Sequence, residues 1–592
     1  MDLSIATVSD AIALNLSEYE YHIICNHLGR IPNLLELEIY ALLWTEHASY
    51  KSSVKWIKTL PSSGSHVIVE ALSENAGVVD LGDGVACVVK IESHNHPCSV
   101  QPKLGTFTGL RVVNRDIFSM GAKPIAYLSS LRFGDRKNRD TAHWFFSEVM
   151  SGLHAFEKSF GVPVLGGDVC FSADFNTNPV VNNMAVGVVA TNKIIRCGAS
   201  KVGSIILLIG SGTGRDGINS DSFVSDYISE NISDTKKLSF NQMTNSRIEN
   251  ALYEAVELLN EKGVVLALQT VGSQGIIGAA AEMAAKGETQ ITLHIDKVPT
   301  YEKGITPREI LISQTWGRML INIDPSMLTM VMELLKPLNL VFSVIGLVEE
   351  GCDLVCKYND DIIISLPANS VGFGGVAPIN ILPFNEPKSS NLRKIDIDLY
   401  PEPDHYPNVI KALINNPNMI GKLAFYRSGI FSEIKGSSLN LDFPGDAYLV
   451  DLEESKKTVA MAIEGNPYYT DADSYIGTQI AFFTLAKNIA CSGAKPLAAV
   501  DCLNFGSPYN RDVYGEFISS VKALTEVSKR INIPIVAGNV SFFNQRSEEG
   551  KLVPIATSPI IGMVGILNNR NHHSTISFKH KGDMIFLLGK SR

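Results

Sequence analysis

Apolar residues along the chain follow two spacings, and each spacing predicts one type of element. Compact runs of β-branched and aliphatic residues, such as residues 85–91 and the start of 202–217, indicate buried strands. In residues 145–160 and 514–530 the apolar positions recur at the helical period instead. Strands and helices alternate in this way over most of the chain. The pattern therefore predicts mixed domains of the α+β or α/β type.

The same phrase occurs twice in the chain. Residues 120–134 read MGAKPIAYLSSLRFG and residues 492–506 read SGAKPLAAVDCLNFG. Residues 162–171 (VPVLGGDVCF) are matched by residues 533–542 (IPIVAGNVSF). Ile91-Glu92 likewise corresponds to Ile463-Glu464, and Arg115-Asp116 to Lys487-Asn488. Such self-similarity predicts an internal duplication, whose two copies we call A1 and A2.

A second kind of domain, B1, is expected after A1. It opens with VGSIILLIGSGTGRDG at residues 202–217, and KGDMIFLLGKSR at residues 581–592 resembles that opening. We therefore expect A–B pairs of which the last B domain is missing. Residues 366–394 are rich in Pro, Gly, Asn and Ser, which is typical of a linker. The expected division is an N-terminal helical segment at 1–60, A1 at 61–195, B1 at 196–365, a linker at 366–400, A2 at 401–570 and a truncated start of B2 at 571–592.

The amino-acid composition and net charge of the chain argue against some classes of binding partner. The chain has 592 residues, of which 45% are apolar and 19% charged, and its net charge is -10. These values are typical of globular domains, and the acidic balance without any Lys/Arg-rich block argues against nucleic acid as a partner. No run is long and apolar enough to span a membrane, so we expect no membrane partner and a cytoplasmic location. The nine scattered cysteines are expected to be reduced.

Side chains with reactive chemistry directly follow the strand predicted at residues 85–91. Residues 90–97 read KIESHNHP, and we expect Pro97 to end the strand and to prevent a helix at the residue before it. Glu92 is a hard oxygen ligand of the kind that Mg²⁺ prefers, and Arg115-Asp116 would add a phosphate-binding fork and a second carboxylate. The cluster predicts a site for a nucleotide and its metal. The alternative is that the two histidines lie on the surface and Glu92 is a solvated charge.

Two further features allow either a functional or a structural interpretation. The glycine-rich turn at the end of 202–217 could cradle an anion with its backbone amides, but it lacks the G-K-[ST] ending of a Walker A loop, so a tight turn explains it equally well. Leu34, Leu35, Leu42 and Leu43 predict a helix that ends near Trp44. His47 would then lie at a helix end, where it could serve a site or cap backbone carbonyls.

Seven separated motifs together resemble one family, the synthetase subunit of phosphoribosylformylglycinamidine synthase, which is the formylglycinamide ribonucleotide amidotransferase of purine biosynthesis. The resemblance runs from about residue 20 to the C-terminus. Its motifs are TEHASYKSS (45–53), KIESHNHP (90–97), RDIFSMGAKPIA (115–126), GRDGI (214–218), AEMAAKG (281–287), DCLNFG (501–506) and GNVS (538–541). The resemblance implies an α+β fold of two aminoimidazole-ribonucleotide-synthetase-like halves, each an A domain followed by a B domain.

The resemblance also implies a reaction and its site. ATP phosphorylates an amide oxygen, and ammonia displaces the phosphate of the resulting iminophosphate to give an amidine. A separate glutaminase subunit supplies the ammonia, within a complex that also has a small accessory subunit. The residues that match the family's functional positions are His47 and His94 for catalysis, with His94 as proton acceptor; Tyr50, Lys90, Asp501 and Gly538 for ATP; Glu92, Asp116 and Asn539 for Mg²⁺; and Ser93, His94, Asn95, His96, Arg115, Gln242 and Ser541 for the ribonucleotide substrate.

Several positions depart from the family pattern. Thr270 stands where the family has the Asp of its Q-D-M-G segment, which removes a magnesium carboxylate. Gln314, Thr315 and Trp316 replace the E-S-Q triplet that contacts the substrate. After HNHP the chain has Gln101 in place of an acidic residue, and Arg111 lies where a close backbone approach is expected. Ala48 replaces the Cys beside the first histidine.

These departures leave several hypotheses open. The chain is an ATP-dependent ligase of the purine pathway, a degenerate paralogue that binds nucleotide or partners without turnover, or a fragment of a longer enzyme. No segment resembles a glutaminase with its Cys-His-Glu set, so the ligase hypothesis needs a glutaminase on another chain. Another enzyme of the aminoimidazole-ribonucleotide-synthetase superfamily is the related alternative, although the TEHASY and IESHNHP segments favour the formylglycinamidine branch.

Overall fold

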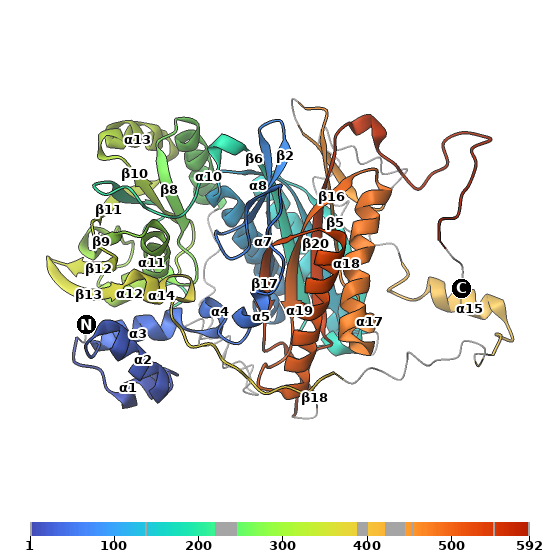
Figure 1. Ribbon diagram of the computed structural model, residues 1–592, viewed down its shortest axis with the longest axis horizontal. Coiled ribbons are helices and arrows are strands. Elements are labelled where there is room, and N and C mark those ends of the chain that lie inside the picture. Colours follow the sequence, from blue (N-terminus) through green and yellow to red (C-terminus); the bar gives the residue numbers. More distant parts are fainter. Residues whose placement is uncertain are drawn as a thin grey trace.

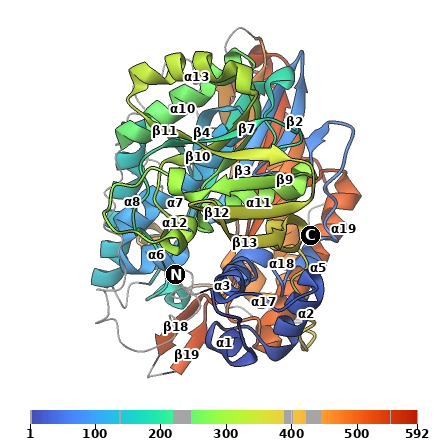
Figure 2. The same ribbon diagram turned by 90° about the vertical axis from the view of Figure 1, so that its left-hand side faces the viewer.

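The computed structural model of the protein describes residues 3–135, 139–218, 246–387, 399, 401–420, 445–452, 455–548 and 551–589. Two A-type sheets occupy the centre of the molecule, and B1 lies at one end above the N-terminal helices (Figure 1). The view in Figure 2 looks onto that end, with the B1 strands in front of the A-type sheets.

The A1 domain is a sheet covered on one face by helices. The strand order is β1-β2-β3-β6-β4-β5, in which β4 and β5 are parallel and the other neighbours antiparallel. Helices α7 and α8 pack on the sheet through an apolar cluster that includes Ile117 and Phe156. The elements are β1 (Val67–Val69), β2 (Gly77–Gly82), β3 (Val85–Ser93), α6 (Asn95–Val100), α7 (Pro102–Ser119), β4 (Lys123–Phe133), α8 (Arg139–Phe160), β5 (Val164–Phe171) and β6 (Val180–Ala190).

The A2 domain repeats the A1 arrangement. Its strand order β14-β15-β20-β16-β17 corresponds to β2-β3-β6-β4-β5, and β16 pairs with β17 in parallel as β4 does with β5. The predicted duplication is therefore confirmed. The elements are β14 (Tyr448–Asp451), β15 (Thr458–Glu464), α17 (Pro467–Ala472), α18 (Ser474–Cys491), β16 (Lys495–Asn504), α19 (Arg511–Ile531), β17 (Ile535–Ser541) and β20 (Ser558–Leu567), with a hairpin of β18 (Gln545–Glu548) and β19 (Lys551–Pro554).

The two A sheets pack face to face. Buried residues of A1, among them Leu128 and Met184, form one apolar cluster with Met461, Val500 and Ile560 of A2. This shared core explains why the faces that the two sheets turn toward each other are rich in valine and isoleucine, because neither of these faces meets water. The packing also brings the end of β3 against β16 and β17 of the other copy. Residues far apart in the sequence thereby share one site.

B1 is a mixed sheet with strand order β13-β12-β9-β11-β7-β10-β8, packed with helices. Helix α3 packs against it, where Trp44 Nε1 donates a 3.0 Å hydrogen bond to the Ser370 carbonyl. The prediction that this helix ends near Trp44 is confirmed. The strands are β7 (Ile205–Gly210), β8 (Val265–Thr270), β9 (Gln290–His294), β10 (Arg318–Ile323), β11 (Val341–Glu349), β12 (Asp353–Tyr358) and β13 (Asp361–Pro367). The helices here and at the N-terminus are α1 (Val8–Ala13), α2 (Glu18–Leu28), α3 (Leu34–Leu43), α4 (Glu46–Ser49), α5 (Val54–Ile57), α10 (Ser246–Glu261), α11 (Gly275–Gly287), α12 (Pro307–Ile312) and α13 (Leu328–Leu335).

The expectation that Pro97 prevents a helix before it was wrong. Helix α6 begins at Asn95, and Pro97 is its third residue. Proline is tolerated there because the first-turn N–H groups of a helix have no intrahelical acceptor, so the missing N–H costs no hydrogen bond. The strand β3 consequently ends at Ser93, and His94 lies between strand and helix.

The segment between B1 and A2 has some regular structure. Helix α14 (Ala368–Val371) lies inside the range predicted as a linker. Residues 375–387 form neither helix nor strand, yet their backbone is hydrogen-bonded both to the N-terminal segment and to A2. Asn380 N donates to the Lys51 carbonyl at 2.8 Å, and Asn385 N donates to the Arg511 carbonyl at 3.1 Å. Beyond residue 400, helix α15 (Tyr406–Ile414) extends away from the sheets (Figure 1).

Residues 581–589 repeat the sequence that opens B1 but not its structure. Met584 to Leu588 are between 73% and 93% exposed and form no strand. The equivalent strand β7 is held between β10 and β11, and no described strand offers such pairing here. An apolar run alone does not form a strand without neighbours. None of the helices in the described part of the chain combines the length and apolar composition that crossing a membrane requires.

Glu157 of α8 supplies a test of this core. Its side chain is buried, one oxygen accepts a hydrogen bond from Val164 N, and burial raises the pKa of the carboxyl to about 7. Because the folded-state pKa lies above the unfolded value of about 4.3, this group's contribution to stability is greatest at low pH and is lost as the pH rises from about 4 to 7. We expect Glu157→Gln to raise the free energy of unfolding by up to about 3 kcal/mol at pH 8 and to change it little at pH 4, as measured by urea titration. Equal effects at both pH values would contradict this.

Candidate functional site

The predicted cluster begins with two charged residues on the same side of β3. Lys90 and Glu92 are two positions apart, so both side chains point toward α7, whereas Ile91 points toward A2. Lys90 Nζ lies 2.9 Å from Glu92 Oε1 and 3.6 Å from Asp116 Oδ2 of α7. Burial raises the pKa of Glu92, although Lys90 opposes that shift, and Asp116 raises it further. The two carboxylates thus converge with a cation between them.

The other face of the β3 end meets A2. Ser93 Oγ donates to Asn539 Oδ1 at 2.9 Å. Asn95 Nδ2 donates to Asn504 Oδ1 at 2.8 Å and to Asn544 Oδ1 at 2.9 Å. Ser541, another predicted site residue, lies in the same network, and Asn544 Nδ2 donates to its Oγ at 3.1 Å. Asn95, Asn504, Ser541 and Asn544 are buried and Ser93 and Asn539 are partly buried, so the second copy holds the segment 93–95 in place.

Three histidines lie close to one another. His94 Nδ1 lies 2.6 Å from the Gly105 carbonyl, so Nδ1 carries the proton and the Nε2 lone pair is available to accept one. Burial lowers the pKa of both His94 and His47 to about 4, and His96 contributes to each shift. His96 Nε2 donates to the Phe543 carbonyl at 3.2 Å. His47 Nε2 is buried and has no hydrogen-bond partner among the described residues. His47 lies in the short helix α4, and because Nε2 has no partner among the described residues, it does not cap a carbonyl through that nitrogen.

The residues expected to contact ATP come from three parts of the chain. Tyr50 takes a left-handed conformation (φ 53°) at the end of α4, and burial raises the pKa of its hydroxyl, with Glu92 and Lys90 nearby. Asp501 is buried on β16, and burial raises the pKa of its carboxyl to about 7. A Cβ at Gly538 would lie 2.5 Å from Asp501 Oδ1, so only glycine fits there. The structure brings Tyr50, Lys90 and Glu92 together, while Asp501 and Gly538 lie side by side on the A2 sheet.

B1 closes the helix side of the site. Arg115 Nη1 donates to the Val271 carbonyl at 3.4 Å, and its guanidinium lies 5.7 Å from the Trp316 ring centre. Thr270, which replaces an expected carboxylate, lies at the end of β8 beside Gln269. Gln269 Nε2 donates to Glu282, and Gln269 Oε1 accepts a hydrogen bond from Asn75 Nδ2. Burial raises the pKa of Glu282 to about 7.

The expected obstruction by Arg111 is not observed. Its side chain is buried and pairs with Glu249 of α10. The close backbone approach to His94 is made by Gly109 instead, where a Cβ would lie 2.8 Å from His94 Cβ. Gln101 is exposed at the junction of α6 and α7.

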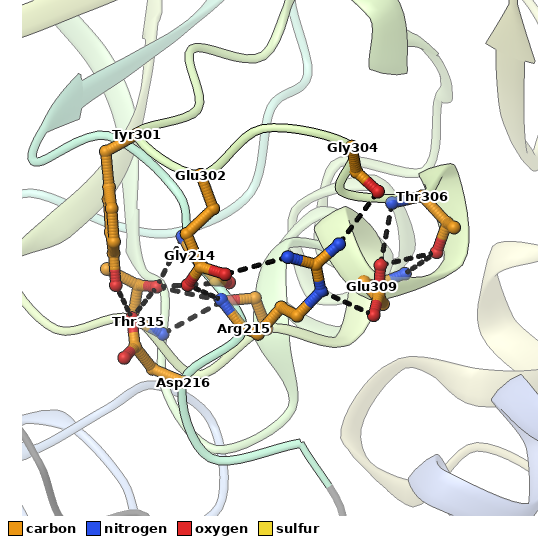
Figure 3. Close-up of polar contacts among 10 residues, drawn as sticks. Gly214, Arg215, Asp216, Tyr301, Glu302, Gly304, Thr306, Glu309 and Thr315 are labelled. Carbon is orange, nitrogen blue, oxygen red and sulfur yellow. Dashed lines mark hydrogen bonds and ion pairs between the residues drawn. The ribbon is translucent and has the colours of Figure 1, made fainter.

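The glycine-rich turn after β7 uses its amides internally. Gly214 N donates to Thr315 Oγ1 at 2.9 Å, and Arg215 N donates to Glu302 Oε1 at 2.7 Å (Figure 3). The carboxylate of Asp216 accepts hydrogen bonds from Thr315 and Tyr301. Donors already bonded to a carboxylate and a hydroxyl do not cradle a phosphate. The tight-turn interpretation of this segment is therefore favoured.

Sequence reasoning overlooked an asparagine pair at the centre of the site. Asn182 and Asn183 of β6 pair in register with Ser93 and Glu92. Asn182 Oδ1 accepts a hydrogen bond from Asn504 Nδ2 at 3.2 Å. Both Nδ2 groups are buried without a hydrogen-bond partner in the described part of the chain. An Asn-Asn doublet inside an apolar strand was the available signal. Gln242, predicted to contact substrate, falls outside the described residues.

A cavity lies at the positions that the duplication relates to this site. Its volume is about 520 Å³, and its lining includes Gly167, Asp168, Glu464 and Asn488. These residues correspond to Gly538, Asn539, Glu92 and Asp116. Burial raises the pKa of Glu464 to about 7. The duplication thus places two related clusters with different charged residues at the junction of the A domains.

The residues at the first site fit a divalent cation. Glu92 and Asp116 already hold one cationic group, the Lys90 ammonium, between them. The amide oxygen of Asn539 accepts a hydrogen bond from Ser93, the residue that follows Glu92. Among the described residues no set of three or more His, Cys, Asp or Glu side chains forms a metal cage. Two carboxylates with further oxygen ligands from phosphates suit Mg²⁺, which binds proteins in this way.

Three known domain families match most of the chain. The family described as AIR synthase related protein, N-terminal domain, matches residues 73–189 and 444–566. The corresponding C-terminal domain matches residues 201–359, and the formylglycinamide ribonucleotide amidotransferase linker domain matches residues 5–51. These matches agree with the two A domains, B1 and the N-terminal helices of the fold.

Curated relatives match nearly the whole chain. The chain is 37% identical to the phosphoribosylformylglycinamidine synthase subunit PurL of Alkaliphilus metalliredigens over 98% of its length, which is 78% of that relative. It is 35% identical to the same subunit of Zymomonas mobilis over 99% of the chain and 78% of the relative. Among solved structures, T. maritima PurL complexed with FGAR superposes with a TM-score of 0.74 at 28% identity, covering 93% of this chain and 83% of that one. T. maritima PurL complexed with ATP gives a TM-score of 0.73 at 27% identity, covering 93% and 82%.

Proposed function

The chain belongs to the family of the phosphoribosylformylglycinamidine synthase subunit PurL, and we propose that it uses ATP to convert formylglycinamide ribonucleotide to the formylglycinamidine ribonucleotide of purine biosynthesis. The observation that carries this proposal is the junction of A1 and A2, where Lys90, Glu92 and Asp116 converge beside His94. Carboxylates for a cation, donors for phosphate and a neutral imidazole are what phosphoryl transfer followed by amination requires.

The proposed reaction has two steps. The formylglycinamide oxygen attacks the γ-phosphorus of ATP, and ADP leaves. Ammonia then attacks the iminophosphate carbon, and inorganic phosphate leaves to give the amidine. His94 takes the proton that the attacking ammonia loses, because its Nδ1 is bonded to the Gly105 carbonyl and its Nε2 lone pair is free to accept. Its low pKa keeps the imidazole neutral at physiological pH.

We assign binding roles to the other converging residues. Tyr50, Lys90, Asp501 and Gly538 would contact ATP, while Ser93, Asn95, His96, Arg115, Gln242 and Ser541 would contact the ribonucleotide. Glu92, Asp116 and Asn539 would hold Mg²⁺, which supplies charge neutralisation of the phosphates when bound. Lys90 would then turn from the carboxylates to the nucleotide. Thr270 leaves this set one carboxylate short of the family pattern, so a weaker hold on Mg²⁺ is expected.

In this proposal another protein chain supplies the ammonia. A glutaminase subunit and a small accessory subunit would be the partners. The likeness to the structure of PurLQS from T. maritima supports an assembly of several subunits, with a TM-score of 0.74 at 27% identity over 94% of this chain and 84% of that one.

The first test supplies ammonium chloride in place of a glutaminase. We expect the purified chain with ATP, Mg²⁺, formylglycinamide ribonucleotide and ammonium chloride to form amidine and ADP in equal amounts, and to form neither without Mg²⁺. Omission of the ribonucleotide is the control for uncoupled ATP hydrolysis. ATP binding without amidine formation would refute the proposal and favour the degenerate paralogue, a candidate to which Thr270 and Trp316 point.

A further inference from the structure

Helix α7 carries two arginines one helical turn apart, and a single indole contacts both. The Trp316 ring centre lies 4.6 Å from the guanidinium carbon of Arg111 and 5.7 Å from that of Arg115. Trp316 lies just before β10 of B1, in the triplet that departs from the family pattern. The indole therefore spans the boundary between A1 and B1 at the edge of the site.

Arg111 belongs to the protein interior. It is 1% exposed, its Nε donates to Glu249 Oε2 at 2.5 Å and its Nη2 donates to the other oxygen of the same carboxylate. Glu249 is 3% exposed. This bidentate pair neutralises the cation, so Arg111 has no charge to offer a ligand. The guanidinium also lies 6.0 Å from the Phe107 ring centre and 4.6 Å from that of Trp316, so the ion pair holds a neutralised cation against the indole.

Arg115 has the opposite character. Its polar contacts are long: 3.4 Å from Nη1 to the Val271 carbonyl and 3.8 Å from Nε to Asp116 Oδ1. Its Nε is buried without a hydrogen-bond partner in the described part of the chain. A Cβ on Gly272 would lie 3.2 Å from Nη2, which shows how closely B1 approaches this guanidinium. Its orientation thus depends on packing rather than on strong hydrogen bonds, and its donors keep capacity for an anion.

We propose that Trp316 is a positioning residue that holds the Arg115 guanidinium ready to bind the phosphomonoester of the ribonucleotide. The inference rests on the proposed function for the identity of that ligand. Arginine binds phosphate in a bidentate geometry. A guanidinium that is already held in the right plane therefore loses less conformational entropy when phosphate binds. An aromatic face stabilises a guanidinium over it. The indole of Trp316 makes no direct polar contact to the substrate in this proposal. Instead it supports Arg115, which makes such a contact.

The test measures equilibrium binding, so that it does not depend on turnover. We expect Trp316→Leu to weaken the affinity for ribose 5-phosphate by about 5- to 30-fold, measured by isothermal titration calorimetry, which is the size of a partly desolvated cation–π contact. Trp316→Phe should retain most of the affinity. Affinity for ATP and the unfolding temperature should stay unchanged. Trp144→Leu, at an indole 46% exposed on α8, is the matched control and should change none of these.

A double-mutant cycle separates positioning from general packing. In an Arg115→Gln background, Trp316→Leu should have no further effect on ribose 5-phosphate affinity. Additive effects, an equal loss of ATP affinity, unchanged affinity in Trp316→Leu or no binding of ribose 5-phosphate by the unaltered chain would each overturn the inference. A chain that binds ribose 5-phosphate through this pair but forms no amidine would sustain the inference and refute only the proposed reaction.

Discussion

Replacing His94 by alanine is expected to lower the rate of amidine formation by about 10²- to 10⁴-fold at saturating ATP, ribonucleotide and ammonium, because that range is what general base catalysis contributes. The imidazole lies between β3 and α6, where its Nδ1 is bonded to the Gly105 carbonyl at 2.6 Å. That bond fixes the tautomer and the direction of the ring, so no flexible neighbour is expected to replace it. The rate constant is to be measured together with the affinity for ATP.

The pH dependence gives this prediction a second readout. Burial lowers the pKa of His94 to about 4, so the base is already deprotonated at pH 6 and the rate should not fall between pH 8 and pH 6 on its account. His27→Ala is the matched control, since that histidine is exposed on α2 and should leave the rate unchanged. A rate for His94→Ala within threefold of the unaltered chain would rule out His94 as the proton acceptor.

Glu249→Gln is expected to lower the free energy of unfolding by about 3–5 kcal/mol, because it leaves the Arg111 guanidinium buried without a counter-charge. Arg111 and Glu249 are 1% and 3% exposed, so water does not compensate for the lost carboxylate. The pair links α7 of A1 to α10 of B1, and we expect the loss to appear as earlier unfolding of that boundary. Urea titration monitored by limited proteolysis would measure it.

The double substitution Arg111→Met with Glu249→Met distinguishes charge from packing. It removes both ions and should recover most of the lost stability, since replacing a buried ion pair by apolar side chains is often neutral or stabilising. Glu386→Gln is the matched control, because its pair with Lys522 is 75% and 49% exposed and should matter by less than about 1 kcal/mol. Glu249→Gln with unchanged stability would show that Arg111 finds another partner or remains hydrated.

Local patterns predicted the elements and the duplication well. The helical period of residues 514–530 lies within α19 (Arg511–Ile531), and the apolar run at 85–91 forms the first seven residues of β3 (Val85–Ser93). Both follow from contacts within a few residues, which the spacing of apolar positions reports directly. The repeated phrases also predicted an internal duplication, and the structure shows it as two sheets with the same strand order. The prediction that Pro97 prevents a helix at the residue before it was wrong, because Pro97 lies in the first turn of α6, where proline is tolerated.

The sequence by itself determined which chemical groups the site contains, because Lys90 to Pro97 place them next to one another on the chain. Only the tertiary structure decided which of them face each other and what surrounds them. Asn95 meets Asn504 and Asn544, and Arg111 meets Glu249, across more than a hundred residues in each case. No periodicity encodes such pairs, since they arise from how two sheets and a neighbouring domain pack. Packing within B1 likewise decided that side chains accept hydrogen bonds from the amides of the glycine-rich turn, and packing of B1 on A1 placed Trp316 beside two arginines.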